Sequence, residues 1–234
     1  MPLIVLWDVD HTLIENCGVS KEIYAAAFTA LTAREPVHPV VTEGRTDRLI
    51  MSELLLRHGA EPSSWDVVER ALVSAGAQWE AELGRRGYVL PGAREALTAL
   101  SGKRDVVSSV LTGNIAANAA VKLRAFELDV LVDLTVGAYG ADGEDRARLV
   151  PVARRRIEAV YGLSSTTPVV LVGDTPRDVR AALDGGVGVV AVASGSYGVE
   201  QLMAAGARSV LPDLRDTSGL LEEIRGQALP LAGS

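Results

Sequence analysis

Acidic side chains follow two separate apolar runs of the sequence. Asp8 and Asp10 come directly after the first run, and Asp174 and Asp178 come after a later one. Carboxylates can act as nucleophiles, as general acids or bases, and as hard oxygen ligands for Mg²⁺. Taken alone, Asp8 and Asp10 could equally form an Asx turn, and Asp174 and Asp178 could be a helix cap and a surface charge. Their chemistry therefore depends on whether the fold brings them together.

A hydroxyl and a glycine follow a third apolar run, in the sequence Thr112-Gly113-Asn114. Thr112 could bind an anion together with backbone N–H groups at the start of the next helix, or it could only cap that helix. In open α/β sheets, ligands bind at the carboxyl ends of the strands. If the three apolar runs are parallel strands, all these residues lie at one sheet edge, and that edge is the predicted site.

Short apolar runs alternate with helix-like stretches along most of the chain. The runs are continuous and rich in branched residues, which is typical of strands buried on both faces. The predicted strands are 3–7, 106–111, 131–136, 169–172 and 187–192, with a weaker one at 209–211; the predicted helices between them are 93–100, 115–126, 146–161 and 177–183. This alternation predicts an α/β fold with a Rossmann-like, doubly wound parallel sheet.

Residues 15–87 interrupt this alternation. They contain no strand-like run, only helical patterns at 21–32, 47–58 and 65–83. We predict an α/β core domain formed by residues 1–14 and 88–234, with an inserted α-helical cap domain formed by residues 15–87.

The acidic and hydroxyl motifs together resemble those of the haloacid dehalogenase-like superfamily. The resemblance rests on Asp8-Val9-Asp10-His11-Thr12-Leu13, Thr112-Gly113-Asn114 and Gly173-Asp174-Thr175-Pro176-Arg177-Asp178, and it extends over essentially the whole chain. The segments 194–198 and 204–207 and the helical insertion are similar to those of phosphoglycolate-phosphatase-like members. Dehalogenating relatives lack the second aspartate, so Asp10 favours phosphoryl chemistry.

This resemblance implies a role for each motif residue. Asp8 would attack phosphorus to give an aspartyl phosphate, and Asp10 would protonate the leaving group and then activate water. Thr112, with Gly113 and Asn114, would bind the phosphoryl oxygens. The implied cofactor is Mg²⁺, held by Asp8, by the backbone carbonyl of Asp10, by Asp174 and by Asp178.

Two positions depart from the family pattern. The family expects a basic residue from a third motif, but no lysine lies between Lys122 and Gly173; the candidates are Arg146, which we favour, and Arg148. His11 stands where the family most often has glycine, and it could contact the leaving group or merely occupy a tolerant loop position.

One loop of the insertion resembles the substrate-facing loop of the family's helical caps. In the sequence Thr42-Glu43-Gly44-Arg45-Thr46-Asp47, Arg45 is a candidate substrate contact. The same loop also reads as a simple helix start, with Thr46 as the N-cap.

Composition limits the possible partners. The 23 basic and 30 acidic residues give a net charge of −7, which argues against nucleic-acid binding. The single cysteine, Cys17, suits a reducing compartment. No apolar run is long enough to span a membrane and no signal peptide is recognisable, so we expect a cytoplasmic protein, a monomer or weak homodimer.

The predicted function is Mg²⁺-dependent hydrolysis of a small phosphorylated metabolite through phospho-Asp8. Two alternatives stay open: a β-phosphoglucomutase-like phosphomutase with the same core, and a non-catalytic phosphoester-binding domain. The sequence does not identify the substrate.

Overall fold

A parallel sheet forms the centre of the molecule in the computed structural model, which describes residues 2–61 and 63–228. Within these residues the strands are β1 (Leu3–Trp7), β4 (Val106–Val110), β5 (Val169–Gly173), β6 (Gly188–Val192) and β7 (Val210–Leu211). They lie in the order β4-β1-β5-β6-β7, and all neighbouring pairs are parallel. The order reverses direction between β1 and β5, which is where such sheets bind ligands.

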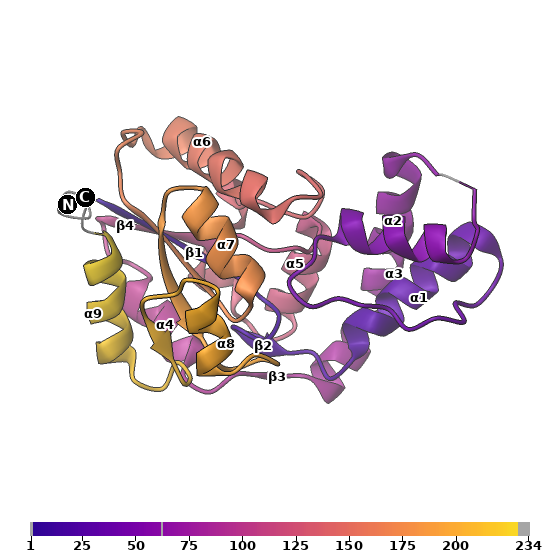
Figure 1. Cartoon of the computed structure of the whole chain (residues 1–234), viewed down its shortest axis with the longest axis horizontal. Coiled ribbons are helices and arrows are strands. Elements are labelled where there is room, and N and C mark those ends of the chain that lie inside the picture. Colours follow the sequence, from indigo (N-terminus) through magenta and orange to yellow (C-terminus); the bar gives the residue numbers. More distant parts are fainter. Residues whose placement is uncertain (1, 62, 229–234) are drawn as a thin grey trace.

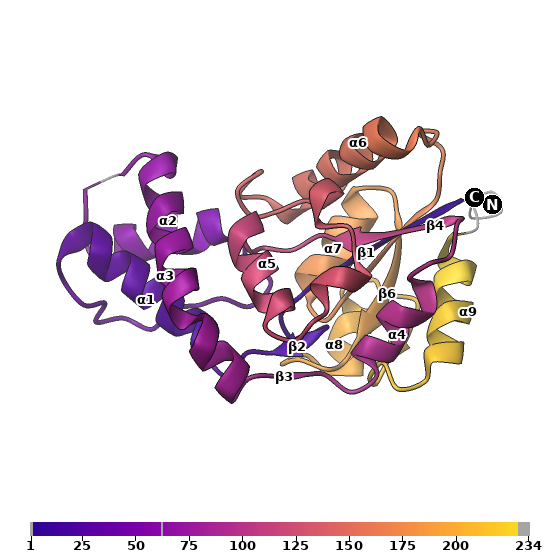
Figure 2. The same ribbon diagram turned by 180° about the vertical axis from the view of Figure 1, so that it is seen from behind.

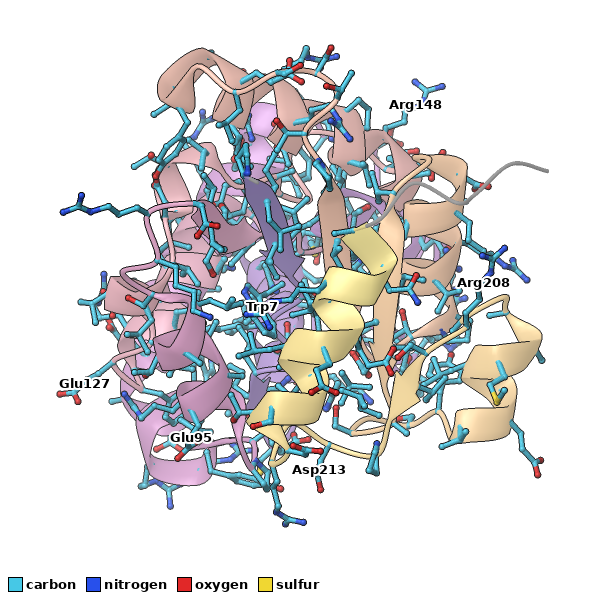
Figure 3. The ribbon with its side chains drawn as sticks, turned by 90° about the vertical axis from the view of Figure 1, so that its left-hand side faces the viewer. Trp7, Glu95, Glu127, Arg148, Arg208 and Asp213 are labelled. Atoms are coloured by element: carbon cyan, nitrogen blue, oxygen red, sulfur yellow. The ribbon has the colours of Figure 1, made fainter. Side chains whose placement is uncertain are left out.

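Alternating side chains of β1 face two hydrophobic clusters, one on each side of the sheet. Val5 and Trp7 belong to the cluster that includes α4 (Ala93–Leu100), α5 (Ala116–Arg124) and α9 (Thr217–Ala228). Ile4 and Leu6 belong to the cluster that includes α6 (Leu149–Tyr161), α7 (Pro176–Asp184) and α8 (Val199–Ala204). Figure 3 shows Trp7 in the middle of the molecule, to the left of the yellow helix α9 in this view. Helices on both faces explain why these strands are mainly apolar, with Ser108 and Ser109 of β4 as polar exceptions. They confirm the predicted α/β fold class.

Three further helices lie together beyond one end of the sheet, opposite the chain termini (Figure 1). They are α1 (Val19–Thr32), α2 (Asp47–Arg57) and α3 (Trp65–Arg86), and they share a third hydrophobic cluster. We call residues 15–87 the helical segment. The chain enters and leaves it through β2 (Ile14–Glu15) and β3 (Tyr88–Val89), a short antiparallel pair that the sequence analysis missed. Figure 2 shows α3 of the helical segment beside α5, one of the helices that cover the sheet.

The prediction of a strand at residues 131–136 is wrong. Two 3₁₀ turns occupy this region, Asp129–Leu131 and Leu134–Val136. The cause is Asp133, whose carboxylate accepts a hydrogen bond from the Thr135 amide at 2.8 Å and so stabilises a turn in the apolar run. The Asp133 amide donates to Ser108 O, so the segment covers the edge strand β4 without extending the sheet.

The other predicted helices begin and end within a few residues of their predicted positions, except that the helix predicted at 146–161 starts as a 3₁₀ turn, Arg146–Arg148, before α6. The sequence analysis predicted neither α8 nor α9. Among the described residues, no helix combines the length and apolar character that crossing a membrane requires.

Candidate active site

The ends of β1 and β5 place two aspartates side by side. Trp7 pairs with Val172 across the two strands, and the Asp8 amide donates to Val172 O at 2.9 Å. Asp8 and Asp174 each come one residue after their strand, and both are buried. The parallel register therefore brings together two acidic residues that are far apart in the sequence.

Asp178 completes a cluster of three buried carboxylates. Asp8, Asp174 and Asp178 each offer an oxygen, and these oxygens lie within 4.8 Å of one another. Asp178 Oδ2 accepts hydrogen bonds from the amide and hydroxyl of Thr175, the N-cap of α7, at 3.0 and 2.6 Å. Asp178 thus both caps α7 and contributes to the acidic cluster.

Arg146 is the cation within this acidic cluster. Its Nη2 lies 2.6 Å from Asp8 Oδ1 and 2.6 Å from Asp178 Oδ1, and its side chain is buried. Arg148, the other candidate from the sequence, is exposed and points away from the molecule (Figure 3). Arg146 and Arg148 are the first and third residues of the 3₁₀ turn before α6. Because such a helix has about three residues per turn, residues two apart face different sides.

The charge of the cluster is only partly balanced by Arg146. Burial raises the pKa of Asp8 to about 6, with further raising by the charges of Asp178 and Asp10, although Arg146 lowers it. Burial and the neighbouring carboxylates also raise the pKa of Asp174 well above its usual value. Three carboxylates facing one guanidinium leave an excess of negative charge, and their hard oxygens suit a divalent cation such as Mg²⁺. The donor set therefore fits the metal that the sequence resemblance implies.

Asp10 lies outside this cluster and is held by different partners. Lys122 Nζ donates to both of its carboxylate oxygens, at 2.8 and 2.6 Å, and Asn114 Nδ2 donates to Oδ2 at 2.8 Å. Removal from water disfavours the charged form of Asp10, but Lys122 and Asn114 outweigh this effect and lower its pKa to about 2. The two carboxylates of the first motif thus have opposite electrostatic environments.

Sequence reasoning missed Lys122. A signal was present, because Ile115, Ala119 and Lys122 follow the i, i+4, i+7 spacing of one helix face, and the first two are apolar. A lysine at the third position of that face is therefore directed toward the interior, where it needs an acidic partner.

Thr112 and Gly113 lie at the end of β4, beside the carboxylates. Thr112 Oγ1 accepts a hydrogen bond from Asn114 Nδ2 at 2.8 Å, which leaves its own hydroxyl hydrogen available to another acceptor. A Cβ on Gly113 would lie 2.0 Å from the Arg45 carbonyl oxygen, so glycine is required here by the close approach of the helical segment. Asn114 supports Thr112 and Asp10 with its side chain.

A small cavity of about 40 Å³ lies between these residues and the helical segment. Its walls include residues from both parts of the chain: Asp8, Asp10, His11, Asn16, Ser20, Tyr24, Thr42, Glu43, Gly44, Arg45, Thr112, Gly113, Asn114, Arg146 and Thr175. Asn16, Ser20 and Tyr24 were not predicted as site residues. They occupy the start of α1 and the turn before it, and only the folded structure shows that these positions face the strand ends.

The two specificity candidates, Arg45 and His11, line this cavity but have partners within the protein. The Arg45 guanidinium is paired with Glu53 on α2. The His11 ring lies 2.9 Å from Glu15, and its backbone has a φ of 59°, in the left-handed region. That conformation explains why glycine suits this position and why histidine, which enters the region more readily than most residues, is tolerated.

Asp47 joins the helical segment to the loop Thr112–Asn114 after β4. Its amide donates to Gly113 O at 2.7 Å, and its carboxylate accepts hydrogen bonds from the Ile115 amide at 2.8 Å and the Tyr24 hydroxyl at 2.5 Å. Asp47 is fully buried, and burial raises its pKa to about 6. The predicted helix start is confirmed, since Thr46 accepts from the Leu49 amide, but the inward role of Asp47 was not foreseen.

We expect Asp47→Ala to lower the free energy of unfolding by about 2–4 kcal/mol, because the Tyr24 hydroxyl and the Ile115 amide lose their partner inside the protein. Asp66→Ala is the matched control, since Asp66 also lies in the first turn of a helix but is exposed. Urea unfolding followed by circular dichroism measures both variants. Equal stability of the two variants would contradict the burial argument.

The chain is similar to known proteins over nearly its whole length. A curated protein of Dickeya dadantii (strain 3937), named "Probable phosphatase IndB", is 25% identical over 226 residues, which cover 94% of this chain and 93% of that protein. A hydrolase from Pseudomonas syringae superposes with a TM-score of 0.69 at 22% identity, over 96% of this chain and 99% of that one. A predicted phosphatase from Clostridium acetobutylicum gives a TM-score of 0.66 at 18% identity, over 95% and 99%.

The family comparison includes the acidic motifs and the helical segment together. Residues 5–183 match the family described as haloacid dehalogenase-like hydrolase. The match contains Asp8, Asp10, Thr112, Asp174 and Asp178, and it covers well over half of the sequence. The chain therefore belongs to the haloacid dehalogenase-like hydrolase family.

Proposed function

We propose that the protein is a Mg²⁺-dependent phosphatase that hydrolyses a small phosphomonoester through a phosphorylated Asp8. The observation that carries this proposal is that Asp8 converges with two other buried carboxylates and pairs with Arg146, while Asp10 and Thr112 line the same cavity as Asp8. A nucleophile, a cation, a phosphate-binding hydroxyl and a second carboxylate are the groups that phosphoryl transfer to and from an aspartate requires.

Asp8 attacks phosphorus with one carboxylate oxygen, and the bond to the leaving oxygen breaks. Arg146 holds Asp8 in place and stays charged throughout. Thr112 donates its free hydroxyl hydrogen to a phosphoryl oxygen. Mg²⁺, held by Asp8, Asp174, Asp178 and the Asp10 carbonyl, would supply positive charge that offsets the phosphoryl oxygens.

Asp10 transfers a proton to the leaving oxygen and later accepts one from the water that hydrolyses the phosphoenzyme. In the absence of substrate its low pKa keeps it ionised. A phosphate dianion beside Asp10 disfavours the ionised carboxylate and so raises the pKa of Asp10. Asp10 then takes up the proton that it donates in the first step.

Residues 15–87 form a cap over this site in our proposal. Asn16, Ser20, Tyr24 and Arg45 are the residues with which this segment lines the cavity. Exclusion of bulk water favours attack by Asp8 over direct hydrolysis, and the side chains of the cap select the leaving group. Arg45 and His11 are the proposed substrate contacts.

The function is tested with a panel of phosphorylated metabolites and 4-nitrophenyl phosphate, with Mg²⁺ and with EDTA. We expect Mg²⁺-dependent release of inorganic phosphate from at least one ester. Isomerised sugar phosphate without free phosphate would instead indicate a phosphomutase. Failure to release phosphate from any ester, with no phosphoenzyme, would support a non-catalytic domain.

A further inference from the structure

Lys122 is a buried cation that has no role in the reaction as proposed above. Its side chain is 2% exposed, and it is among the largest fully buried side chains of the described residues. Burying an ammonium group costs several kcal/mol before its partners compensate, and an apolar side chain of similar volume avoids that cost. A lysine at this position therefore indicates a requirement beyond packing.

The ammonium group has three donors and three acceptors at short distance. It donates to Asp10 Oδ1 at 2.8 Å, to Asp10 Oδ2 at 2.6 Å and to Asn114 Oδ1 at 2.6 Å. Because lysine can only donate, the oxygen of the Asn114 amide must face Lys122 and its nitrogen must face away. That nitrogen donates to Asp10 and to Thr112, both at 2.8 Å. Lys122 thus fixes the orientation of Asp10 directly and through Asn114.

The two buried cations divide the carboxylates of the site between them. Arg146 contacts Asp8 and Asp178, whereas Lys122 contacts Asp10. Asp10 is accordingly absent from the group of carboxylates that converge on one point. Asn16 Nδ2 from the helical segment donates to Asp10 Oδ1 at 2.8 Å on its remaining side. The carboxylate of Asp10 is therefore held at the cavity by partners of its own, separate from the three carboxylates that converge on one point.

We propose that Lys122 is a positioning residue that holds Asp10 in the orientation needed to protonate the leaving group. The inference rests on the proposed phosphatase function, and it assigns to a helix outside the family motifs a part in one particular step. Lys122 itself contacts neither substrate nor metal. Its contribution should therefore depend on how much the leaving group needs a proton.

Two aryl phosphates of similar shape test this dependence. Phenyl phosphate releases a basic phenolate that needs protonation, whereas 4-nitrophenyl phosphate releases a stable anion. The ratio kcat/KM reports steps up to formation of the phosphoenzyme and excludes its later hydrolysis. For Lys122→Met we expect kcat/KM to fall at least about 10²-fold on phenyl phosphate and less than about 10-fold on 4-nitrophenyl phosphate, since general acid catalysis contributes about 10²–10⁴-fold.

Arg124→Met is the matched control, because Arg124 lies on the same helix and its exposed side chain pairs with Glu80. Arg124→Met should leave kcat/KM unchanged on both phenyl phosphate and 4-nitrophenyl phosphate. Lys122→Met should also keep the rise in Tm that Mg²⁺ gives, because the acidic cluster has its own cation. Lys122→Gln, which retains an N–H donor, should show a smaller loss with the same preference, and it serves the comparison if the methionine variant does not fold.

An equal fall in kcat/KM on the two esters, or no fall, would overturn the role of Lys122 while leaving the phosphatase function in place. A wild-type protein that hydrolyses neither these esters nor the metabolite panel would reject the phosphatase function and the role of Lys122 with it.

Discussion

Asp8→Asn is expected to lower kcat by at least about 10⁴-fold, with the fold retained. The amide has nearly the same shape as the carboxylate, but it is a much weaker nucleophile and cannot form the aspartyl phosphate. Loss of a covalent nucleophile in other hydrolases costs a factor of this order or more. Asp8 also contacts Arg146 at 2.6 Å, so the substitution replaces an ion pair by a neutral contact. Steady-state phosphate release measures the effect.

Asp184→Asn is the control for this experiment. Asp184 is an exposed aspartate at the last position of α7, the helix that carries Asp178 near its start. It should keep wild-type activity. An Asp8→Asn variant with a kcat within about tenfold of the wild type would rule out Asp8 as the nucleophile.

Removal of divalent metal is expected to abolish turnover and to lower thermal stability. Binding of Mg²⁺ to the folded state at about 100 times its Kd would stabilise it by about 2.7 kcal/mol. Asp174→Asn removes one charged ligand, so the rise in Tm on adding Mg²⁺ should fall by more than half in this variant. Differential scanning fluorimetry with Mg²⁺ and with EDTA measures both proteins.

The effect of Mg²⁺ should also depend on pH, because burial raises the pKa values of Asp8 and Asp174. Between about pH 4 and 6 the metal-free folded protein holds more protons at Asp8 than the unfolded chain, so Asp8 makes stability fall as pH rises through that window. The raised pKa of Asp174 acts in the same direction. Mg²⁺ binds the deprotonated carboxylates. The rise in Tm should therefore be larger near pH 7.5 than near pH 5. Activity in EDTA equal to that in Mg²⁺ would contradict the metal assignment.

The sequence predicted the parts of the fold that follow from local patterns. Continuous runs such as Leu3–Trp7 indicate buried parallel strands, and parallel strands bring their carboxyl ends to one edge whatever the details of packing. For that reason Asp8, Thr112 and Asp174 lie at one edge, as expected. The strand prediction at 131–136 failed because the Asp133 side chain stabilises a turn. The apolar content of the run does not show that a turn competes with a strand.

The unpredicted features of the site depend on tertiary contacts. Lys122 and Asp47 are polar residues on helices, where a surface position is the ordinary expectation. Their burial results from partners that come from distant segments, Asp10 in one case and Tyr24 and Ile115 in the other. Motif spacing carries no information on these pairings. The first forms only when α5 packs beside the end of β1, and the second only when the helical segment lies against the loop after β4.

The most direct test of the central claim is detection of the phosphoenzyme. Wild-type protein with Mg²⁺ is mixed with a hydrolysed ester, quenched in acid within the first turnover, digested and analysed by mass spectrometry. The account predicts one added phosphoryl group on the peptide that contains Asp8, and none in the Asp8→Asn variant. Phosphate release that proceeds with no modified peptide, or with the phosphoryl group on a different residue, would contradict it.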